Sequence, residues 1–332
     1  MLQFPDEEKR CKQLQLALGS QFDLAEHAYS YWLTRPENSY LLNSSETPWP
    51  RTVNVPRKTI HLAMTMNVQM LRLFRSAVEM CSRGESLSAN ILTRSLYETV
   101  LALDFILRNE VAVFIGPVMH KECGSKMGKQ KELDGLPMFQ VKPLSTKSSD
   151  TRVILSRDQR TKFYIAHDFL GRKRHTRSLA SIPEMKAISD EQIAQEVPGL
   201  DELVRSNVGD KWYTILKESK SWSGLSIRDL TTVLGSVFET WHAIVYPVQS
   251  RMSHSGDALQ LIGGFLDNDD IYWKMFSTNE EVSGVLLVAT ALFIGGLRVV
   301  QDCIDLGEEH EKVIEELHAE NKRLRDESNK TT

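Results

Sequence analysis

Two long stretches of helical periodicity, separated by only three residues, constrain the fold of this chain more than any other feature. Apolar side chains recur every three or four positions between residues 57 and 82, and the same spacing returns between residues 86 and 113. The break between them, Arg83-Gly84-Glu85, leaves room only for a tight turn. Two amphipathic helices joined in this way fold back as an antiparallel hairpin, which needs further helices to cover its apolar faces.

Further helical stretches follow later in the chain. We expect helices over residues 226–261, interrupted at Pro247, and over 280–306, while the charged residues 308–328 form a helical extension or short coiled coil. With 41% hydrophobic and 25% charged residues, the composition is that of an ordinary globular protein. The expected fold class is therefore all-α, a helical bundle with an irregular basic insertion and a charged C-terminal helical tail.

Changes in composition along the chain predict three parts. Residues 1–50 form an N-terminal helical extension, 51–306 the bundle domain, and 307–332 the charged tail. An insertion at about 116–210 interrupts the bundle. Its first part, 116–149, is rich in Gly, Pro, Lys and Ser and has no sustained period, which indicates a loop.

Residues 282–297 carry no charge, so they are either a membrane span or a buried core helix. The stretch is slightly short for a bilayer and contains five glycine and alanine residues, which favours the core helix. No signal peptide is visible, and the four cysteines are scattered without metal-ligand spacing. We therefore expect a cytoplasmic protein with no membrane partner, no metal and no other cofactor.

A charged pair interrupts an apolar stripe on the second helix of the hairpin. At helical spacing one side of this helix carries Leu87, Ile91, Arg94, Glu98, Leu101 and Phe105. Charges are costly to bury and are kept only when they are paired. Arg94 and Glu98 therefore either form a structural salt bridge that sets the helix register, or line a polar pocket inside the bundle.

A second polar stripe lies on a later helix, provided that the helix continues past Pro247. Its members, spaced by four, four and three residues, are Tyr246, Ser250, His254 and Asp257. Arg251 lies next to this stripe. These side chains supply hydrogen-bond donors and acceptors and one imidazole that titrates near neutral pH. The alternative is a solvated helix face beyond a proline kink.

Positive charge is concentrated in the insertion. Residues 121–177 contain 14 Lys and Arg and 6 Asp and Glu, a net charge of +8, although the whole chain has a net charge of −4. The densest basic group consists of Arg172, Lys173, Arg174 and Arg177. Such a segment suits the phosphate backbone of a nucleic acid. The alternative is a loop that contacts the acidic remainder of its own fold.

Three segments in this order resemble a large bacterial family, domain of unknown function 5677. They are Thr93-Arg94-Ser95-Leu96-Tyr97-Glu98, then Trp222 to Arg228, then Tyr246 to His254, and the resemblance covers roughly residues 56–306. Members of this family resemble HEPN domains, the helical bundles of toxins and anti-phage systems. Many HEPN proteins are metal-independent ribonucleases with an Arg and a His on one helix. Here only Met252 and Ser253 separate Arg251 from His254, which is closer than in that motif.

Two functions from different classes remain open, the first supported by the polar helix faces, the basic insertion and the resemblance, the second by the departure from the Arg and His spacing and by the charged tail. The first is a metal-independent ribonuclease of HEPN-like type in a bacterial defence or toxin context, with RNA as partner and a homodimer as assembly. In this reading His254 is the general base or acid, Arg94 or Arg251 stabilises charge on the phosphate, and Tyr246, Ser250 and Glu98 orient these groups. The alternative is a non-catalytic helical partner-binding or sensor module that associates through its charged tail. A small-molecule site between the helices is a third reading, without a ligand class.

Overall fold

The chain forms two compact units. Unit 1 draws on residues 1–55, 60–107 and 237–332, and unit 2 on residues 56–59 and 108–236. The computed structural model describes residues 7–34, 55–108, 111–114, 131–133, 136–140, 151–179, 186, 199, 201–218, 221–223, 225–253, 263–265, 271–273, 277–304 and 306–331.

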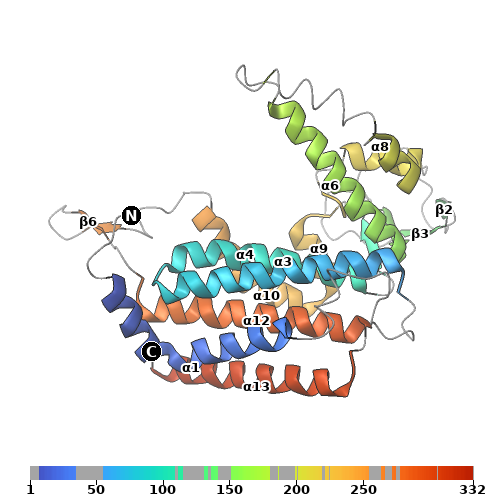
Figure 1. The fold of residues 1–332 in the computed structure, drawn as a ribbon. Helices are drawn as coiled ribbons and strands as arrows, with labels where there is room; N and C mark the ends of the chain where they lie inside the picture. Colours follow the sequence, from blue (N-terminus) through green and yellow to red (C-terminus); the bar gives the residue numbers. More distant parts are fainter. Residues whose placement is uncertain are drawn as a thin grey trace. The chain divides into compact units, whose positions relative to one another are not determined.

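Unit 1 is a helical bundle, as the periodicity predicts. Its helices are α1 (Glu7–Leu33), α3 (Arg57–Ser82), α4 (Ser86–Leu107), α10 (Ser236–Ser253), α12 (Asn279–Ile304) and α13 (Glu308–Thr331). The apolar α12 packs against α4, α1 and α13, so it is the central element of the bundle. In Figure 1 it lies between the α3–α4 hairpin and the pair formed by α1 and α13.

The turn between α3 and α4 lies where the sequence breaks its period. Gly84 has a φ of 77°, in the left-handed region that glycine adopts at low cost. The N–H of Glu85 donates a 2.9 Å hydrogen bond to the carbonyl oxygen of Met80, which closes the end of α3. α4 ends at Leu107, earlier than the predicted residue 113, because the chain enters a β-strand at Val111.

Close packing between α3, α4 and α12 forms the core of unit 1. The rings of Phe74 and Phe293 stack with centroids 4.4 Å apart, and both side chains are fully buried. A Cβ on Gly296 would lie 2.2 Å from Cε of Met70 and 3.2 Å from Cγ2 of Val100. Gly296 therefore has a structural role, since its missing side chain lets α12 approach the hairpin closely.

α12 begins with reciprocal capping and is mostly buried. The N–H of Thr278 donates to Glu281 Oε2 over 2.8 Å, and the N–H of Glu281 donates to Thr278 Oγ1 over 3.3 Å. By length and composition α12 is one helix, among the residues described, that could cross a membrane. In the structure 72% of its most apolar 18-residue stretch is buried inside the protein, as expected for a core helix.

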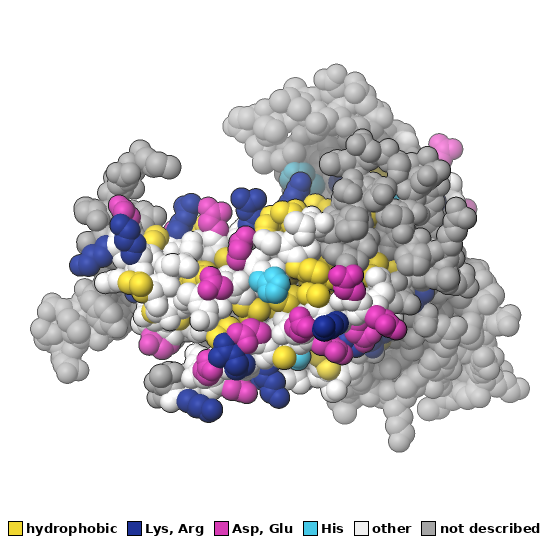
Figure 2. Space-filling view, turned by 60° about the horizontal axis from the view of Figure 1, so that its bottom comes forward, with side chains coloured by type: hydrophobic (Ala, Val, Ile, Leu, Met, Phe, Trp, Pro, Cys, Tyr) yellow, Lys and Arg dark blue, Asp and Glu magenta, His cyan; other side chains and the backbone are white. Residues whose placement is uncertain are grey.

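The charged tail is helical, and its apolar seam packs within the chain. Ile314, Leu317 and Leu324 of α13 are buried against the bundle. His310 is fully buried, with its ring 5.5 Å from that of Tyr31. The apolar side of the charged tail is therefore packed within the chain. Figure 2 shows acidic and basic side chains interspersed over the face of unit 1 that carries α13.

Unit 2 contains ordered elements where the sequence suggested an irregular insertion. Four short strands, β1 (Val111–Phe114), β2 (Lys131–Leu133), β3 (Leu136–Gln140) and β4 (Thr151–Leu155), form an antiparallel sheet in the order β1-β4-β3-β2. The helices that follow include α6 (Arg157–Leu179), α8 (Asp210–Glu218) and α9 (Ile227–Leu234). α8 packs on α6, and α9 contacts β1.

The helix expected over 226–261 is divided at Gly235. This glycine has a φ of 106° and separates α9 from α10. α10 continues through Pro247 to Ser253, so the predicted break was placed at the wrong residue. Residues 254–262 lie outside the described chain, and β5 (Gly263–Phe265) pairs with β6 (Ile271–Trp273) beyond them.

Candidate functional site

The charged pair of α4 lies at the edge of the core and is partly open to solvent. Arg94 Nε donates a 3.0 Å hydrogen bond to Glu98 Oε1, and the two side chains are 19% and 40% exposed, respectively. The sequence suggested apolar surroundings for the pair, yet Ile91, one turn earlier, is exposed, whereas residues 101–107 are all buried. Only the C-terminal part of α4 is thus buried on all sides, and the pair precedes it.

Tyr246 of α10 contacts Arg94 in two ways. Arg94 Nη2 donates to the Tyr246 hydroxyl oxygen over 3.3 Å, and the guanidinium carbon lies 4.8 Å from the centroid of the Tyr246 ring. A cation over the face of a phenol ring is attracted by its quadrupole. The structure therefore brings together three of the candidate residues, Arg94, Glu98 and Tyr246, from two helices.

His242 extends this cluster and was not among the sequence-based candidates. Its ring stacks on that of Tyr246, with centroids 4.6 Å apart and 23° between the planes, and lies 6.4 Å from the ring of Tyr97. His242 precedes Tyr246 by four residues, so the polar stripe through Ser250 and His254 begins one helical turn earlier than proposed. This regular spacing was the signal that could have identified it.

Tyr97 of α4 supplies a buried phenol beside the cluster. Its side chain is fully buried, and its hydroxyl has no hydrogen-bond partner among the described residues. Burial raises the pKa of Tyr97 above its ordinary value, and the Glu98 carboxylate and the Tyr246 phenol raise it further. The hydroxyl of Tyr97 therefore stays protonated throughout the physiological range.

The remaining candidates lie beyond what the structure describes. Ser250 and Arg251 belong to α10, but their side chains are not described, and neither is any part of His254. Their roles remain predictions. In the described part of the chain, no group of three His, Cys, Asp or Glu residues could hold a metal ion.

The residues that do meet offer a defined chemistry. A guanidinium, an imidazole, two phenols and a carboxylate lie on adjoining turns of α4 and α10. Arg94 can hold an anion such as a phosphate, and the imidazole of His242 offers a ring nitrogen that donates and one that accepts.

The basic group predicted in the insertion lies on a continuous helix, α6. Arg172 forms a 2.8 Å ion pair with Asp168, and both side chains are largely exposed. Arg174 Nη2 lies 3.2 Å from His167 Nε2. Burial lowers the pKa of His167, and the adjacent Arg174 lowers it further. Arg172 and Arg174 are thus both at the surface of α6.

Lys173 differs from its two neighbours. Its side chain is only 7% exposed and forms an ion pair with Asp201, whose other carboxylate oxygen accepts a 2.8 Å hydrogen bond from the Tyr213 hydroxyl. The ammonium group of Lys173 is therefore engaged inside unit 2 and is not at the surface where a nucleic acid would bind. The side chain of Arg177 lies outside the described residues.

One part of the chain, which includes most of the α3–α4 hairpin, is similar to a protein family. Residues 61–143 match the model of a family of unknown function, DUF5677. The expected resemblance is confirmed for this DUF5677 segment, which contains Arg94, Tyr97 and Glu98 but not α10. The searches of curated proteins and of solved structures each found no significant match.

Proposed function

We propose that the chain is a metal-independent ribonuclease of HEPN-like type, in a bacterial defence or toxin context. The observation that supports this proposal is the placement of Arg94 against Tyr246, with His242 stacked on the same phenol ring. A cation for a phosphate and a proton-transfer group within one cluster are the two parts that RNA cleavage by its own 2′-hydroxyl requires.

The proposed reaction uses side chains for positioning and for proton transfer. An imidazole, from His242 or from His254, takes the proton of the ribose 2′-hydroxyl. That oxygen then attacks the adjacent phosphorus, and the 5′-oxygen of the next nucleotide leaves and takes up a proton. Arg94, held by Glu98 and Tyr246, stabilises the charge that develops on the phosphate oxygens. The products are a 2′,3′-cyclic phosphate and a free 5′-hydroxyl.

The test is cleavage of end-labelled RNA by the purified full chain in the presence of a chelator. We expect the wild type to cleave the RNA and the single variant Arg94→Met to be inactive. Of the two single histidine variants, His242→Asn and His254→Asn, one should also be inactive. A matched substrate with a single 2′-deoxy nucleotide at the cut site should resist cleavage there. Full activity in Arg94→Met and in both histidine variants would refute the proposal.

Arg172 and Arg174 are proposed to contact the RNA backbone. Each phosphate contact adds to the salt dependence of binding, so the double variant Arg172→Ala/Arg174→Ala should flatten the plot of log Kd against log salt concentration. Lys162→Ala, on the same helix and paired with Asp158, is the matched control. An equal change in the control would show that the effect is not local.

The alternative function is a non-catalytic partner-binding module, and either function needs a surface for association. On α10 the apolar side chains of Val237 and Ile244 are 65% and 56% exposed, beside a groove of about 530 Å³ lined also by Leu287 and Val288 of α12. An apolar ridge next to an apolar groove allows a twofold pairing in which each ridge enters the groove of the other copy.

We propose a second copy of this chain as the partner at this groove. Sedimentation should show a dimer that Ile244→Glu dissociates and that Leu16→Glu, at an exposed apolar position of α1, leaves intact. A wild-type protein that stays monomeric at high concentration would refute this dimer. That result would leave the ribonuclease proposal standing, because the Arg94 cluster lies within one chain.

A further inference from the structure

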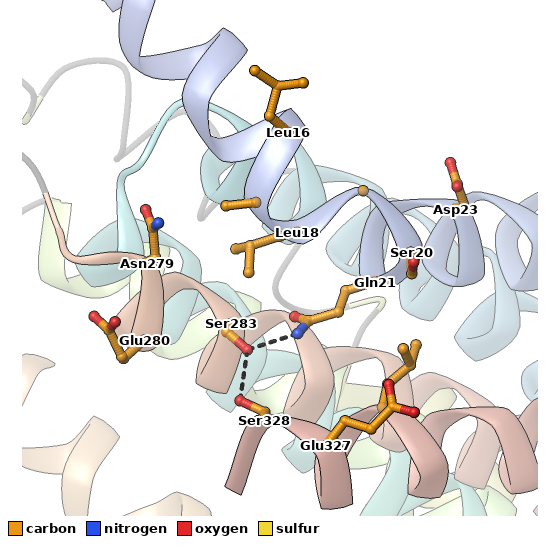
Figure 3. A pocket seen from close by; sticks show the side chains of 13 residues that line it. Leu16, Leu18, Ser20, Gln21, Asp23, Asn279, Glu280, Ser283, Glu327 and Ser328 are labelled. Carbon is orange, nitrogen blue, oxygen red and sulfur yellow. Dashed lines mark hydrogen bonds between the residues drawn. The ribbon is translucent and has the colours of Figure 1, made fainter. Parts of the chain in front are cut away.

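A recess at one end of the bundle is separate from the Arg94 cluster. It has a volume of about 580 Å³ and is lined by residues of α1, α12 and α13. At this point α1 is kinked, because Leu18 has non-helical angles of φ −122° and ψ 17°. The first turn of α12 and the last turns of α13 complete the walls, as Figure 3 shows.

Two amide side chains present acceptor atoms in this recess. Gln21 is only 9% exposed and extends from α1 toward α12, where its Nε2 donates a 2.8 Å hydrogen bond to Ser283 Oγ (Figure 3). Ser283 Oγ in turn lies 3.3 Å from Ser328 Oγ of α13. Among the described residues, Gln21 Oε1 and Asn279 Oδ1 have no hydrogen-bond donor. A buried acceptor without a donor costs about 1–3 kcal/mol, so a ligand that donates N–H groups would stabilise this arrangement.

The charges around the recess favour a cation. Its lining includes the carboxylates of Asp23, Glu280 and Glu327 and no Lys, Arg or His. Glu327 also accepts a 2.5 Å hydrogen bond from Arg323, which lies outside the lining and offsets part of its charge.

The arrangement suits an extended organic cation better than a metal ion. The three carboxylates come from three different helices, and among the described residues no three His, Cys, Asp or Glu side chains converge as metal ligands do. Apolar side chains, Leu16 and Leu18, lie between the polar groups along α1. Methylene groups of a ligand can pack on them while separate ammonium groups reach the carboxylates and amide oxygens.

We infer that this recess binds a linear aliphatic polyamine. One ammonium group donates to Gln21 Oε1, and another donates to Asn279 Oδ1 or lies near Asp23 or Glu280 at the mouth. A volume of about 580 Å³ accommodates such a molecule. The inference is independent of the ribonuclease proposal, because it uses none of the same residues.

The test is isothermal titration of the full chain with spermidine at physiological ionic strength. We expect one saturable site, weakened at least about tenfold by Gln21→Met, which keeps the volume but removes the acceptor. The double variant Asp23→Asn/Glu280→Gln should weaken binding further. Glu309→Gln is the matched control, since it lies about 27 Å along α13 from Glu327, well beyond a Debye length of about 8 Å.

A steric variant covers the case in which Gln21→Met disturbs folding. Gly19 lines the recess, and a Cβ at this position would meet no atom within 4 Å, so the first atom of the Gly19→Phe side chain has room there. This variant should fold, by circular dichroism, and should lose spermidine binding. The inference would be overturned if spermidine binding did not saturate, or if Glu309→Gln weakened it as much as Gln21→Met does. Spermidine binding retained in Gly19→Phe, or displaced by millimolar Mg²⁺ alone, would also overturn it.

Discussion

Replacement of Arg94 by Met removes the cation of the candidate site while its apolar stem is kept. The ion pair with Glu98 spans one helical turn and is partly exposed, so it contributes about 0.3–0.5 kcal/mol. The position of the guanidinium over the Tyr246 ring adds about 0.5–1 kcal/mol. The long hydrogen bond to the Tyr246 hydroxyl adds about 0.5 kcal/mol. The expected loss in the free energy of unfolding is therefore about 1–2 kcal/mol.

This value is well below the roughly 3–5 kcal/mol that follows when one member of a fully buried pair is removed. The reason is that Glu98 is 40% exposed, so water can solvate its carboxylate after Arg94 is lost. The assay is urea unfolding at pH 7, with hydrogen exchange of the α4 amides as the local probe. A local probe is needed because the chain has two units and need not unfold in one step. Glu98→Gln is the matched control and should cost less than Arg94→Met, because the cation–ring contact survives.

A loss above about 3 kcal/mol would refute this reasoning and would show that the pair is desolvated. No measurable loss would refute the contribution of the Tyr246 contacts. Within the expected range, Arg94→Met at 25 °C stays folded. Any loss of RNA cleavage in this variant is then a loss of chemistry and not of structure.

Three further outcomes follow from the described residues. Phe74→Ala removes one member of the buried stack with Phe293 and should destabilise unit 1 by about 3–5 kcal/mol in urea unfolding. Tyr97→Phe removes a buried hydroxyl that has no partner among the described residues, so the thermal midpoint should stay unchanged or rise. The pKa of His167 is lowered in the folded chain by burial and by Arg174, so its contribution to stability is present above its unfolded pKa and is lost as the pH falls below it. Wild type should lose more stability than His167→Gln between pH 7.5 and pH 5.5, measured by thermal unfolding.

Local periodicity was enough to predict most helices, because a helix is specified by residues three and four apart. The α3–α4 hairpin, the apolar α12 and the charged α13 all follow from such spacing. The pairing of Arg94 with Glu98 follows for the same reason, since both lie on one helix. The prediction was wrong where a single residue changed the backbone direction, as at Gly235 with its positive φ.

Periodicity says which face of a helix is apolar but not which other helix covers it. The contact between Arg94 and Tyr246 joins residues 152 positions apart, and that between Gln21 and Ser283 joins residues 262 positions apart. The sequence around each of these residues does not indicate which distant residue it contacts. By itself the sequence determined the helices, their charge and the candidates on them, because these depend on neighbours along the chain. Only the tertiary structure decided which candidates meet, because long-range packing sets the contacts between elements.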